Sequence, residues 1–407
     1  MTLEGVTWLL HSNRNGASAR LQGYLIHDYL KSKGFNSQIL LKPPTTTTIP
    51  WREGILETVA SIVNTRIVVF QKLDNELRAA KLISHLRRRG IVTIFVECDY
   101  RPDNHIPEMC DCVVVPSKFL FDFYSSQGLR CVQIPDPIEN IISHDAILEN
   151  HQQRRSTQSI RLVWVGQSSN WSTIEPLRRC LEGYEYRKQF ELFTISSHPE
   201  ADIQWDLQTV AQNVAIGDVG VIPTSTYPGA EAKSANRLLL FMALGVPVIA
   251  GDIPAYREII DDGVNGFIAD SCEKWQFALD KLRDPDVRLE IAVNAFNNVV
   301  PQFTLDHIAQ YWIELFSEIT APVSETPFSK LSQYRRVTRK MQIDAEANLH
   351  YVDVALDRHL WGIVWWRFFS ALVLLPVVPR TIAGWGYLIT RRLYKTKRRI
   401  LKLMSAR

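Results

Sequence analysis

The stretch IVVFQKLDNELRAAKLISHLRRRGIVTIFV (67–96) contains one complete strand–helix–strand unit. Ile67–Phe70 and Ile91–Val96 are short runs rich in β-branched and aromatic residues, which predict two strands. Between them, Asn75–Arg89 has the spacing of an amphipathic helix, and Gly90 stands where a helix ends. A run such as IVVF, apolar at every position, is typical of a parallel strand covered on both faces. The unit therefore predicts an α/β fold with a doubly wound sheet.

The same alternation extends in both directions from this unit. As far as residue 134 it predicts further strands at Val6–Leu10, Phe35–Leu41, Cys112–Val115 and Arg130–Ile134, and helices at Ser18–Lys33, Arg52–Val63 and Ser117–Gln127. A polar segment (135–159) is interpreted as a connection between domains, and strands then recur at Leu162–Val165, Phe190–Ile195, Val219–Ile222 and Val246–Ala250. We therefore predict two Rossmann-like, doubly wound domains that face a cleft, because such sheets bind ligands at the carboxyl ends of their strands.

Length and composition agree with two folded domains. The chain has 407 residues, of which 46% are hydrophobic and 22% charged, so it is too long for one ordinary domain and too apolar to be disordered. We divide it into an N-terminal Rossmann-like domain (1–140), a second Rossmann-like domain (155–320), a connector (321–357) and a C-terminal tail (358–407).

The charge is distributed unevenly along the chain, although the net charge is only +3. No Asp or Glu follows Asp357, whereas eleven Lys or Arg do, so residues 1–357 hold 35 basic against 43 acidic residues. The acidic body and the basic tail are therefore expected to face different partners.

The tail combines this charge with apolar and aromatic residues. Its tryptophans at 361, 365, 366 and 385 favour a bilayer interface, while its longest charge-free pieces (368–379 and 381–390) are shorter than the roughly 20 residues of a spanning helix. We expect residues 358–407 to bind an anionic membrane surface as a monotopic or re-entrant anchor, and not nucleic acid. A protein-docking segment and a true transmembrane helix are the alternatives.

The cysteines and the N-terminus indicate the compartment. The six cysteines (98, 110, 112, 131, 180 and 272) form no CxxC pair and are predicted to be free thiols in a reducing compartment. The start MTLEGVTWLL lacks a basic region and is predicted to be a first strand and not a signal peptide. The expected location is the cytoplasm, peripheral or monotopic on the inner face of the plasma membrane.

The stretch GAEAKSANRLLLFMALGVPVIAGDIPAYRE (229–258) carries the clearest chemical signal. A helix is predicted from about Ser234 to Leu244, and Lys233 and Arg237, four residues apart, would share one face of its first turn. Cations at a helix N-terminus are disfavoured by the helix dipole, unless an anion lies between them. A diphosphate held by helix amides, an ammonium and a guanidinium would fit. The alternative is a solvated basic turn without a ligand.

This stretch resembles the C-terminal donor domain of GT-B glycosyltransferases, in particular the retaining, family 4-like enzymes. The resemblance rests on the run K-S-A-N-R…M-A-L-G-V-P-V-I-A…P-x-Y-R-E-I-I-D-D-G-V-N-G-F. It is extended by LVWVG (162–166), FTIS (193–196) and DVGVIPT (218–224), and in the first domain by NRNGASARLQG (13–23), VVFQK (68–72) and CVVVPSKFL (112–120). It covers roughly residues 1–320.

The resemblance implies transfer of a sugar from a nucleoside-diphosphate donor to an acceptor hydroxyl. Lys233 and Arg237 would be catalytic, binding the diphosphate and stabilising its growing charge as the glycosidic bond breaks. The donor would also be contacted by small and polar residues at strand ends and helix starts, namely Gly16, Ala17, Gly166, Ser196, Ser197, Thr224, Glu231 and Asn236.

Two residues of the first domain are candidates for acceptor binding. Asp99 follows a predicted strand and would point into the cleft, with a solvated loop acid as the alternative. Arg20 could face an acidic acceptor or simply lie on the surface of its helix. His11 ends the first strand and is expected to pack or hydrogen-bond locally rather than act as a base.

The sequence also departs from the family pattern. The family usually carries two glutamates eight residues apart, whose positions here are Ala232 and Leu240, although Glu231 could replace the earlier one. An arginine after the first donor-domain strand is replaced by Gln167. A catalytically silent homologue acting as a membrane scaffold, and a sugar-nucleotide epimerase or hydrolase, are therefore the alternative functions.

No cofactor or catalytic metal is predicted, and the nucleotide-sugar is a substrate. The sequences PDP (135–137) and Asp284-Pro285-Asp286 are interpreted as structural turns, because neither follows an apolar strand. The chain is thus predicted to be a metal-independent, hexosyltransferase-type enzyme. It would be retaining by analogy, and its acceptor would be a lipid-linked or cell-surface glycan at the cytoplasmic membrane face.

Overall fold

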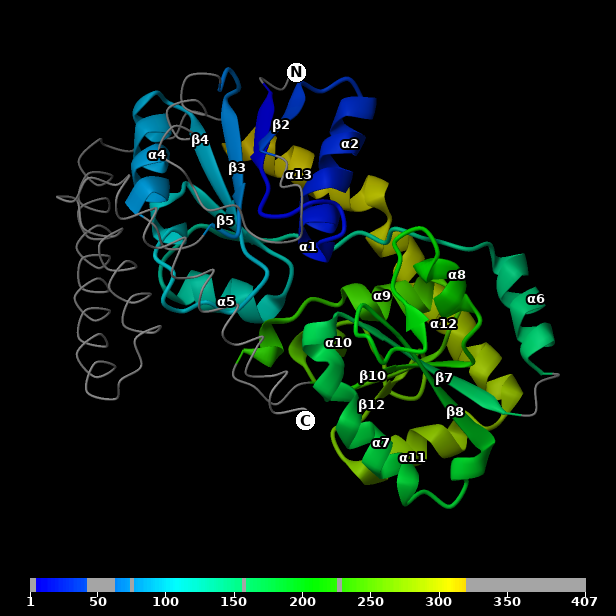
Figure 1. Cartoon of the computed structure of the whole chain (residues 1–407). Helices are drawn as coiled ribbons and strands as arrows, with labels where there is room; N and C mark the ends of the chain where they lie inside the picture. Colours follow the sequence, from blue (N-terminus) through cyan, green and yellow to red (C-terminus); the bar gives the residue numbers. More distant parts are fainter. Residues whose placement is uncertain (1–4, 42–62, 74–76, 156–158, 225–228, 320–407) are drawn as a thin grey trace, which may run out of the picture.

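The computed structural model describes residues 5–41, 63–73, 77–155, 159–224 and 229–319. These residues form two α/β domains, seen in Figure 1 as an upper lobe in blue to cyan and a lower lobe in green to yellow. Each domain is built on a six-stranded sheet in which all strand pairs are parallel. The predicted pair of doubly wound α/β domains is confirmed. The predicted helix Arg52–Val63, the connector and the tail lie outside or almost outside the described residues.

The first sheet has the order β2-β1-β3-β4-β5-β6. Its strands are β1 (Val6–Leu9), β2 (Ser37–Leu41), β3 (Ile67–Gln71), β4 (Val92–Val96), β5 (Cys112–Val115) and β6 (Cys131–Gln133). The strand order reverses between β1 and β3, and a doubly wound sheet binds ligands at the carboxyl ends of the strands at that point.

The second sheet has the order β12-β11-β10-β7-β8-β9. Its strands are β7 (Ile160–Gly166), β8 (Phe190–Ser196), β9 (Ile203–Gln204), β10 (Val219–Ile222), β11 (Val248–Ala250) and β12 (Phe267–Ile268). Numbered within the domain, this is the classical dinucleotide-binding order, and its reversal lies between β7 and β10.

Helices cover both sheets and follow the predicted alternation. In the first domain they are α1 (Ala17–Ala19), the π-helical turn η1 (Arg20–Tyr24), α2 (Leu25–Ser32), α4 (Leu77–Arg88), η2 (Pro107–Met109) and α5 (Lys118–Ser126). The remaining helices are α6 (His144–Arg154), η3 (Ser168–Ile174), α7 (Glu175–Glu182), η4 (Arg187–Gln189), α8 (Val210–Ala215), η5 (Ala230–Ala232), α9 (Asn236–Ala243), α10 (Pro254–Arg257), α11 (Cys272–Lys281), α12 (Pro285–Phe303) and α13 (Leu305–Ile319).

Two segments differ from the prediction, one in its secondary structure and the other in the domain on which it packs. Helix α6 occurs within the segment predicted as a polar connection (135–159), and it packs on the second domain, where Ile147 lies against Gly245. Helix α13 was assigned with the second domain but packs on the first, because its apolar stripe, including Trp312, joins the buried cluster around Trp8. Figure 1 shows this yellow helix returning to the upper lobe. The chain therefore crosses between the domains twice.

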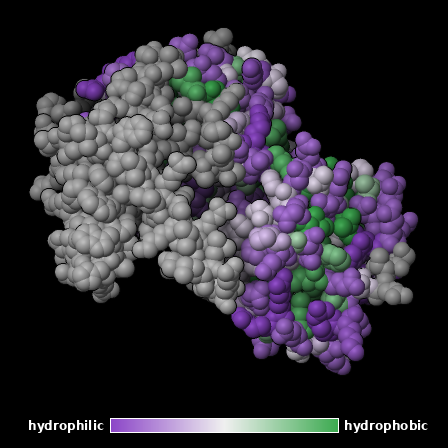
Figure 2. All heavy atoms as spheres, viewed as in Figure 1, coloured by the Kyte–Doolittle hydropathy of each residue, from purple (hydrophilic) through white to green (hydrophobic). Residues whose placement is uncertain are grey.

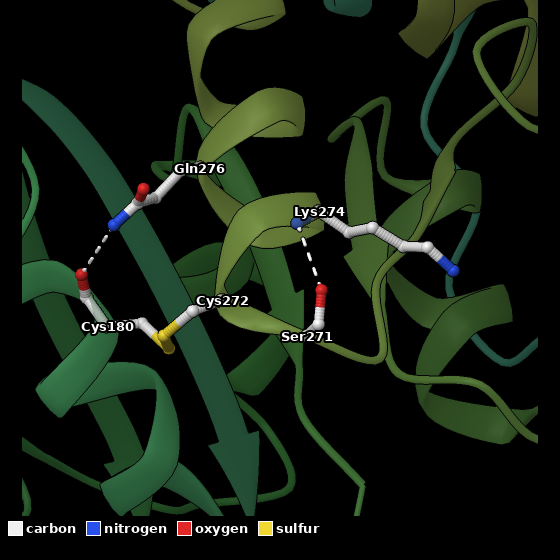
Figure 3. The surroundings of a disulfide bond; sticks show 5 residues. All are labelled: Cys180, Ser271, Cys272, Lys274 and Gln276. Atoms are coloured by element: carbon white, nitrogen blue, oxygen red, sulfur yellow. Dashed lines mark hydrogen bonds between the residues drawn. A yellow bond between two sulfur atoms is a disulfide. The ribbon is translucent and has the colours of Figure 1, made fainter.

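A disulfide joins Cys180 of α7 to Cys272 of α11 (Figure 3). Beside it, Gln276 Nε2 donates to the carbonyl oxygen of Cys180 at 3.2 Å, and Ser271 caps α11 by accepting from the backbone N–H of Lys274. The prediction of six free thiols is wrong for these two cysteines. They are 92 residues apart, and only the packing of α7 on α11 brings them together.

The other four cysteines, all in the first domain, are free. Burial raises the pKa of Cys112 and of Cys131 to about 12, so these thiols are unreactive at neutral pH. None of the helices in the described part of the chain has the length and hydropathy needed to cross a bilayer. On the face seen in Figure 2, the second domain is mainly hydrophilic, with apolar residues between the polar ones.

Candidate active site

Polar side chains gather at the carboxyl ends of β1, β3 and β4, where the first sheet reverses its order. His11 follows β1, and its Nδ1 lies 3.0 Å from Oε1 of Gln71 at the end of β3. Burial, and then the charge of Lys72, lower the pKa of His11 to about 4. The imidazole is therefore neutral at physiological pH, which agrees with the expected local hydrogen bonding.

The turn after β4 is fixed by a buried carboxylate. Glu97 is fully buried and accepts from the backbone N–H groups of Cys98 and Asp99 at 2.9 and 3.1 Å. Burial raises the pKa of Glu97, and the guanidinium of Arg101, whose Nε donates at 2.6 Å, opposes that shift. Glu97 thereby sets the backbone conformation that presents Asp99.

Asp99 forms a bridge between the two domains, which we call the Lys72–Asp99–Lys233 bridge. Lys72 Nζ donates to Oδ2 of Asp99 at 2.7 Å, and Lys233 Nζ donates to Oδ1 at 2.8 Å. Burial alone would raise the pKa of Asp99, but the two ammonium groups outweigh it and hold that pKa below its usual range. The predicted acceptor residue is thus an ionised group bound to a predicted catalytic residue.

The segment that carries Lys233 is docked on the first domain. Ser117 donates to the carbonyl oxygen of Ala232 at 3.0 Å, and Ala232 is fully buried in a cluster that includes Val113 of β5. Gly229 has φ +89°, and a Cβ there would lie 2.8 Å from Cβ of Tyr100. The backbone of residues 229–233 is therefore positioned by both domains.

The helix after Lys233 begins later than predicted. Helix α9 starts at Asn236, and Lys233 precedes it with extended backbone, φ −61° and ψ 141°. The two cations therefore do not share a helix face, because Lys233 is extended and two residues, Ser234 and Ala235, separate it from the first residue of α9. Arg237 is the second residue of α9, whose first turn contains no acidic residue. Its Nη1 is buried and has no hydrogen-bond partner within the described residues, so it is a donor suited to an anion.

The predicted donor residues of the second domain lie around the reversal between β7 and β10. Gly166 ends β7, and a Cβ there would lie 2.5 Å from the Trp164 ring. Ser196 ends β8 and accepts from the backbone N–H of His198 at 3.1 Å, and Ser197 follows it at an exposed position. Thr224 follows β10 beside Gly251. The sheet thus brings together residues from three separate motifs.

The remaining predicted donor contacts lie at helix starts. Gly16 is the N-cap of α1, and a Cβ there would lie 2.0 Å from Oγ of Ser12, so a side chain at this position would require Ser12 to move. Ala17 follows as the first helical residue. Glu231 is exposed in η5, and Asn236 begins α9.

Arg20 does not face the cleft as a free group. It is buried, and its guanidinium donates to Oε1 and Oε2 of Glu139 at 2.5 and 3.0 Å and to the carbonyl oxygen of Arg14 at 2.8 Å. Its guanidinium carbon also lies 6.0 Å from the centre of the Trp205 ring in the second domain. Arg20 therefore ties the first domain to the linker. The alternative of a surface residue is wrong, and the predicted contact of Arg20 with the acceptor stays a prediction.

Sequence reasoning missed several residues of this region. Lys72 belongs to the motif VVFQK (68–72), but sequence reasoning assigned it no role in the site. Its φ of +50° is the one positive value of a non-glycine residue in the described ranges. Asp136 was interpreted as a turn residue, yet it is buried at the linker, and burial raises its pKa to about 6 against the stabilising side chain of Ser234. Trp171 stacks on His198 at 4.2 Å between ring centres. The hydrophobic pattern of the sequence does not indicate these residues, because their role depends on contacts with elements that are distant in the sequence.

The structure shows what surrounds the Asp-x-Asp sequence at 284–286 and the position of the later family glutamate. Asp284 is the N-cap of α12 and accepts from the backbone N–H of Asp286 at 2.8 Å, so this pair begins a helix and does not form the predicted turn. Within the described ranges, no group of three or more His, Cys, Asp or Glu residues could hold a metal ion. Leu240, at the position of the later family glutamate, is partly buried against the core of the second domain.

Comparisons with known proteins agree with this arrangement. Residues 138–284 match the sequence model of the family described as glycosyl transferases group 1. This match lies in the linker and the second domain and covers less than half of the chain. A search of functionally characterised proteins finds no significant match.

Solved structures show the same fold over most of the chain. A glycosyltransferase from Rickettsia africae has a TM-score of 0.62 and 14% identity, and the match covers 79% of this chain and 100% of the other. Sucrose-phosphate synthase from Thermosynechococcus elongatus has a TM-score of 0.59 and 15% identity over 77% and 98% of the two chains. HepE from Anabaena, solved with UDP and glucose, has a TM-score of 0.57 and 13% identity over 77% and 100%. The chain has the GT-B fold.

Proposed function

We propose that this chain is a glycosyltransferase that moves a hexosyl group from a nucleoside-diphosphate donor to a glycan acceptor. The observation that carries the proposal is the pair of cations at the start of α9, with the buried Arg237 Nη1 lacking a partner within the described residues. Its location in the region that matches the group 1 family, at the edge of a sheet of dinucleotide-binding order, supports a phosphorylated donor. HepE, which has the same fold, binds UDP and UDP-glucose.

The proposed chemistry uses electrostatic stabilisation of the leaving group. As the bond between the anomeric carbon and the diphosphate oxygen breaks, the oxygen keeps the electron pair and its negative charge grows. Lys233 and Arg237 would stabilise that charge and make a metal ion unnecessary. The acceptor hydroxyl oxygen forms the new bond to the anomeric carbon, and its proton passes to the departing diphosphate. Retention of configuration rests on the family resemblance alone.

The acceptor and its location complete the proposal. The basic, tryptophan-rich sequence of residues 358–407 supports binding to the anionic inner face of the plasma membrane, and hence a lipid-linked or cell-surface glycan acceptor. Co-sedimentation of the full chain with vesicles of neutral lipid, with or without anionic lipid, tests this part. Binding that does not depend on anionic lipid would contradict it.

The donor site is tested by calorimetry of the full chain with UDP, GDP, ADP, CMP and dTDP. We expect one nucleoside diphosphate to bind at micromolar Kd, and Lys233→Ala and Arg237→Ala each to weaken it at least tenfold, roughly the contribution of one charge-assisted contact. Lys274→Ala is the matched control, because Lys274 is an exposed lysine of the same domain paired with Asp270. Absence of binding to the folded protein would favour the scaffold alternative.

Turnover separates the remaining alternatives. With the bound donor and a membrane fraction as acceptor, a transferase incorporates labelled sugar into lipid or glycan. An epimerase or hydrolase consumes the donor equally well without membranes. Transfer that survives the combined Lys233→Ala and Arg237→Ala substitutions would refute the proposed site.

A further inference from the structure

The Lys72–Asp99–Lys233 bridge places a carboxylate on the cation that the proposed function assigns to the donor diphosphate. Oδ1 of Asp99 lies 2.8 Å from Lys233 Nζ, which is the distance a phosphate oxygen would adopt on the same ammonium group. A second anion at that distance would lie close to the ionised Asp99, and like charges so close repel. The carboxylate and a diphosphate therefore compete for Lys233.

We propose that Asp99 is a positioning residue that occupies the place of the donor diphosphate on Lys233 and is displaced when the donor binds. The inference rests on the proposed function. Lys72 keeps the displaced carboxylate in the cleft, because it holds the other oxygen, Oδ2, at 2.7 Å. The freed Oδ1 then accepts a hydrogen bond from the acceptor hydroxyl. Donor binding thus creates the acceptor contact, and the donor binds first.

The exchange needs only a change of side-chain partner. The backbone on each side of the bridge is fixed independently of it: Glu97 holds the turn that carries Asp99, and the Ser117 hydroxyl and the buried Ala232 hold the segment before Lys233. The two domains therefore need not separate when Lys233 turns from the carboxylate to a phosphate. The two lysines also keep Asp99 ionised, so it competes as a full negative charge.

The test is the affinity of the full chain for nucleoside diphosphate, measured by calorimetry with the member of the UDP, GDP, ADP and dTDP series that binds. Asp99→Asn removes the competing charge and keeps the shape, so we expect its Kd to fall about tenfold, within the usual range of coupling between two sites. The corresponding nucleoside without phosphate should show no gain. Asp99→Glu, which keeps the charge, should stay near the wild-type Kd.

Three further variants make the result specific. Asp122→Asn removes an exposed carboxylate of α5 in the same domain and should leave the Kd unchanged, which controls for net charge. In the Lys233→Ala background, Asp99→Asn should give a smaller gain, because the competition for Lys233 is gone and only the direct repulsion between the carboxylate and the diphosphate remains. Asp99→Ser provides the same charge removal if the Asn variant does not fold. In the transfer assay, the Asp99→Asn protein should show a lower donor KM together with a lower kcat.

The outcomes separate this inference from the proposed function. An unchanged or weaker Kd in folded Asp99→Asn, with Lys233→Ala still weakening binding, would overturn the inference and leave the donor site standing. A gain of the same size in the Lys233→Ala background would also overturn it. Failure of the wild-type chain to bind any nucleoside diphosphate would overturn both.

Discussion

Removal of the Cys180–Cys272 disulfide is expected to destabilise the second domain strongly. The bond closes a loop of 92 residues, from α7 to α11. In the chain-entropy account, cross-linking a loop of this length removes about 16 cal/mol/K from the unfolded state, which is about 4.6 kcal/mol at 25 °C. Measured effects are usually smaller, about 2–4 kcal/mol. The two cross-linked helices, α7 and α11, pack in the core of the second domain. We therefore expect the loss of stability to be confined to that domain.

The assay begins with the thiols themselves. Alkylation under denaturing, non-reducing conditions followed by mass spectrometry should label four cysteines, and six only after reduction. Urea unfolding is then followed by tryptophan fluorescence for the wild type, Cys180→Ser/Cys272→Ser and the control Cys131→Ser. We expect the double variant, and the wild type in reductant, to unfold at a clearly lower urea concentration. Hydrogen exchange should locate the loss in α7 and α11.

Two results would refute this reasoning. Six labelled thiols without reduction would show that the bond does not form in the protein as isolated. An unchanged urea midpoint in the double variant, with four labelled thiols in the wild type, would show that packing of α7 on α11 is sufficient without the bond. Because disulfides are rare in reducing compartments, a stable bond would also contradict the predicted cytoplasmic environment of this domain.

Three further predictions concern the linker and the first loop. Burial raises the folded-state pKa of Asp136 from 3.8 to about 6, so the folded protein binds more protons than the unfolded chain between these values. The free energy of unfolding should therefore fall by about 2 kcal/mol as the pH rises from 4 to 7, and urea titrations of Asp136→Asn should lose this dependence. Arg20→Met removes the partner of the Glu139 carboxylate and should cost about 1 kcal/mol, and adding Glu139→Leu should cost little more; additive costs of the two substitutions would contradict the pairing. Gly16→Ala forces a Cβ against Ser12 and should lower the melting temperature and nucleotide affinity, with partial rescue by Ser12→Ala; no effect of Gly16→Ala would show that the loop adapts freely.

Local patterns were sufficient for the fold because each of them reports on one element at a time. The runs at β3 and β5 are apolar at every position and predicted buried parallel strands, and both were found there. Gly90 and Gly128 follow helices with positive φ, as their positions in the pattern indicated. Helix α6 was not predicted because its sequence is mostly polar. Only Ile147, His151 and Arg154 are buried, so the sequence shows no clear apolar stripe.

The sequence alone determined the two doubly wound domains, the family resemblance of residues 229–258 and the residue types at the candidate donor site. Only the tertiary structure decided which groups meet. It joined Asp99 to Lys72 and Lys233, turned Arg20 toward Glu139 and paired Cys180 with Cys272. The physical reason is that strand and helix formation depends on neighbouring residues, whose spacing is visible in the sequence. Ion pairs and disulfides between distant residues depend on how whole elements pack, and no local pattern records that.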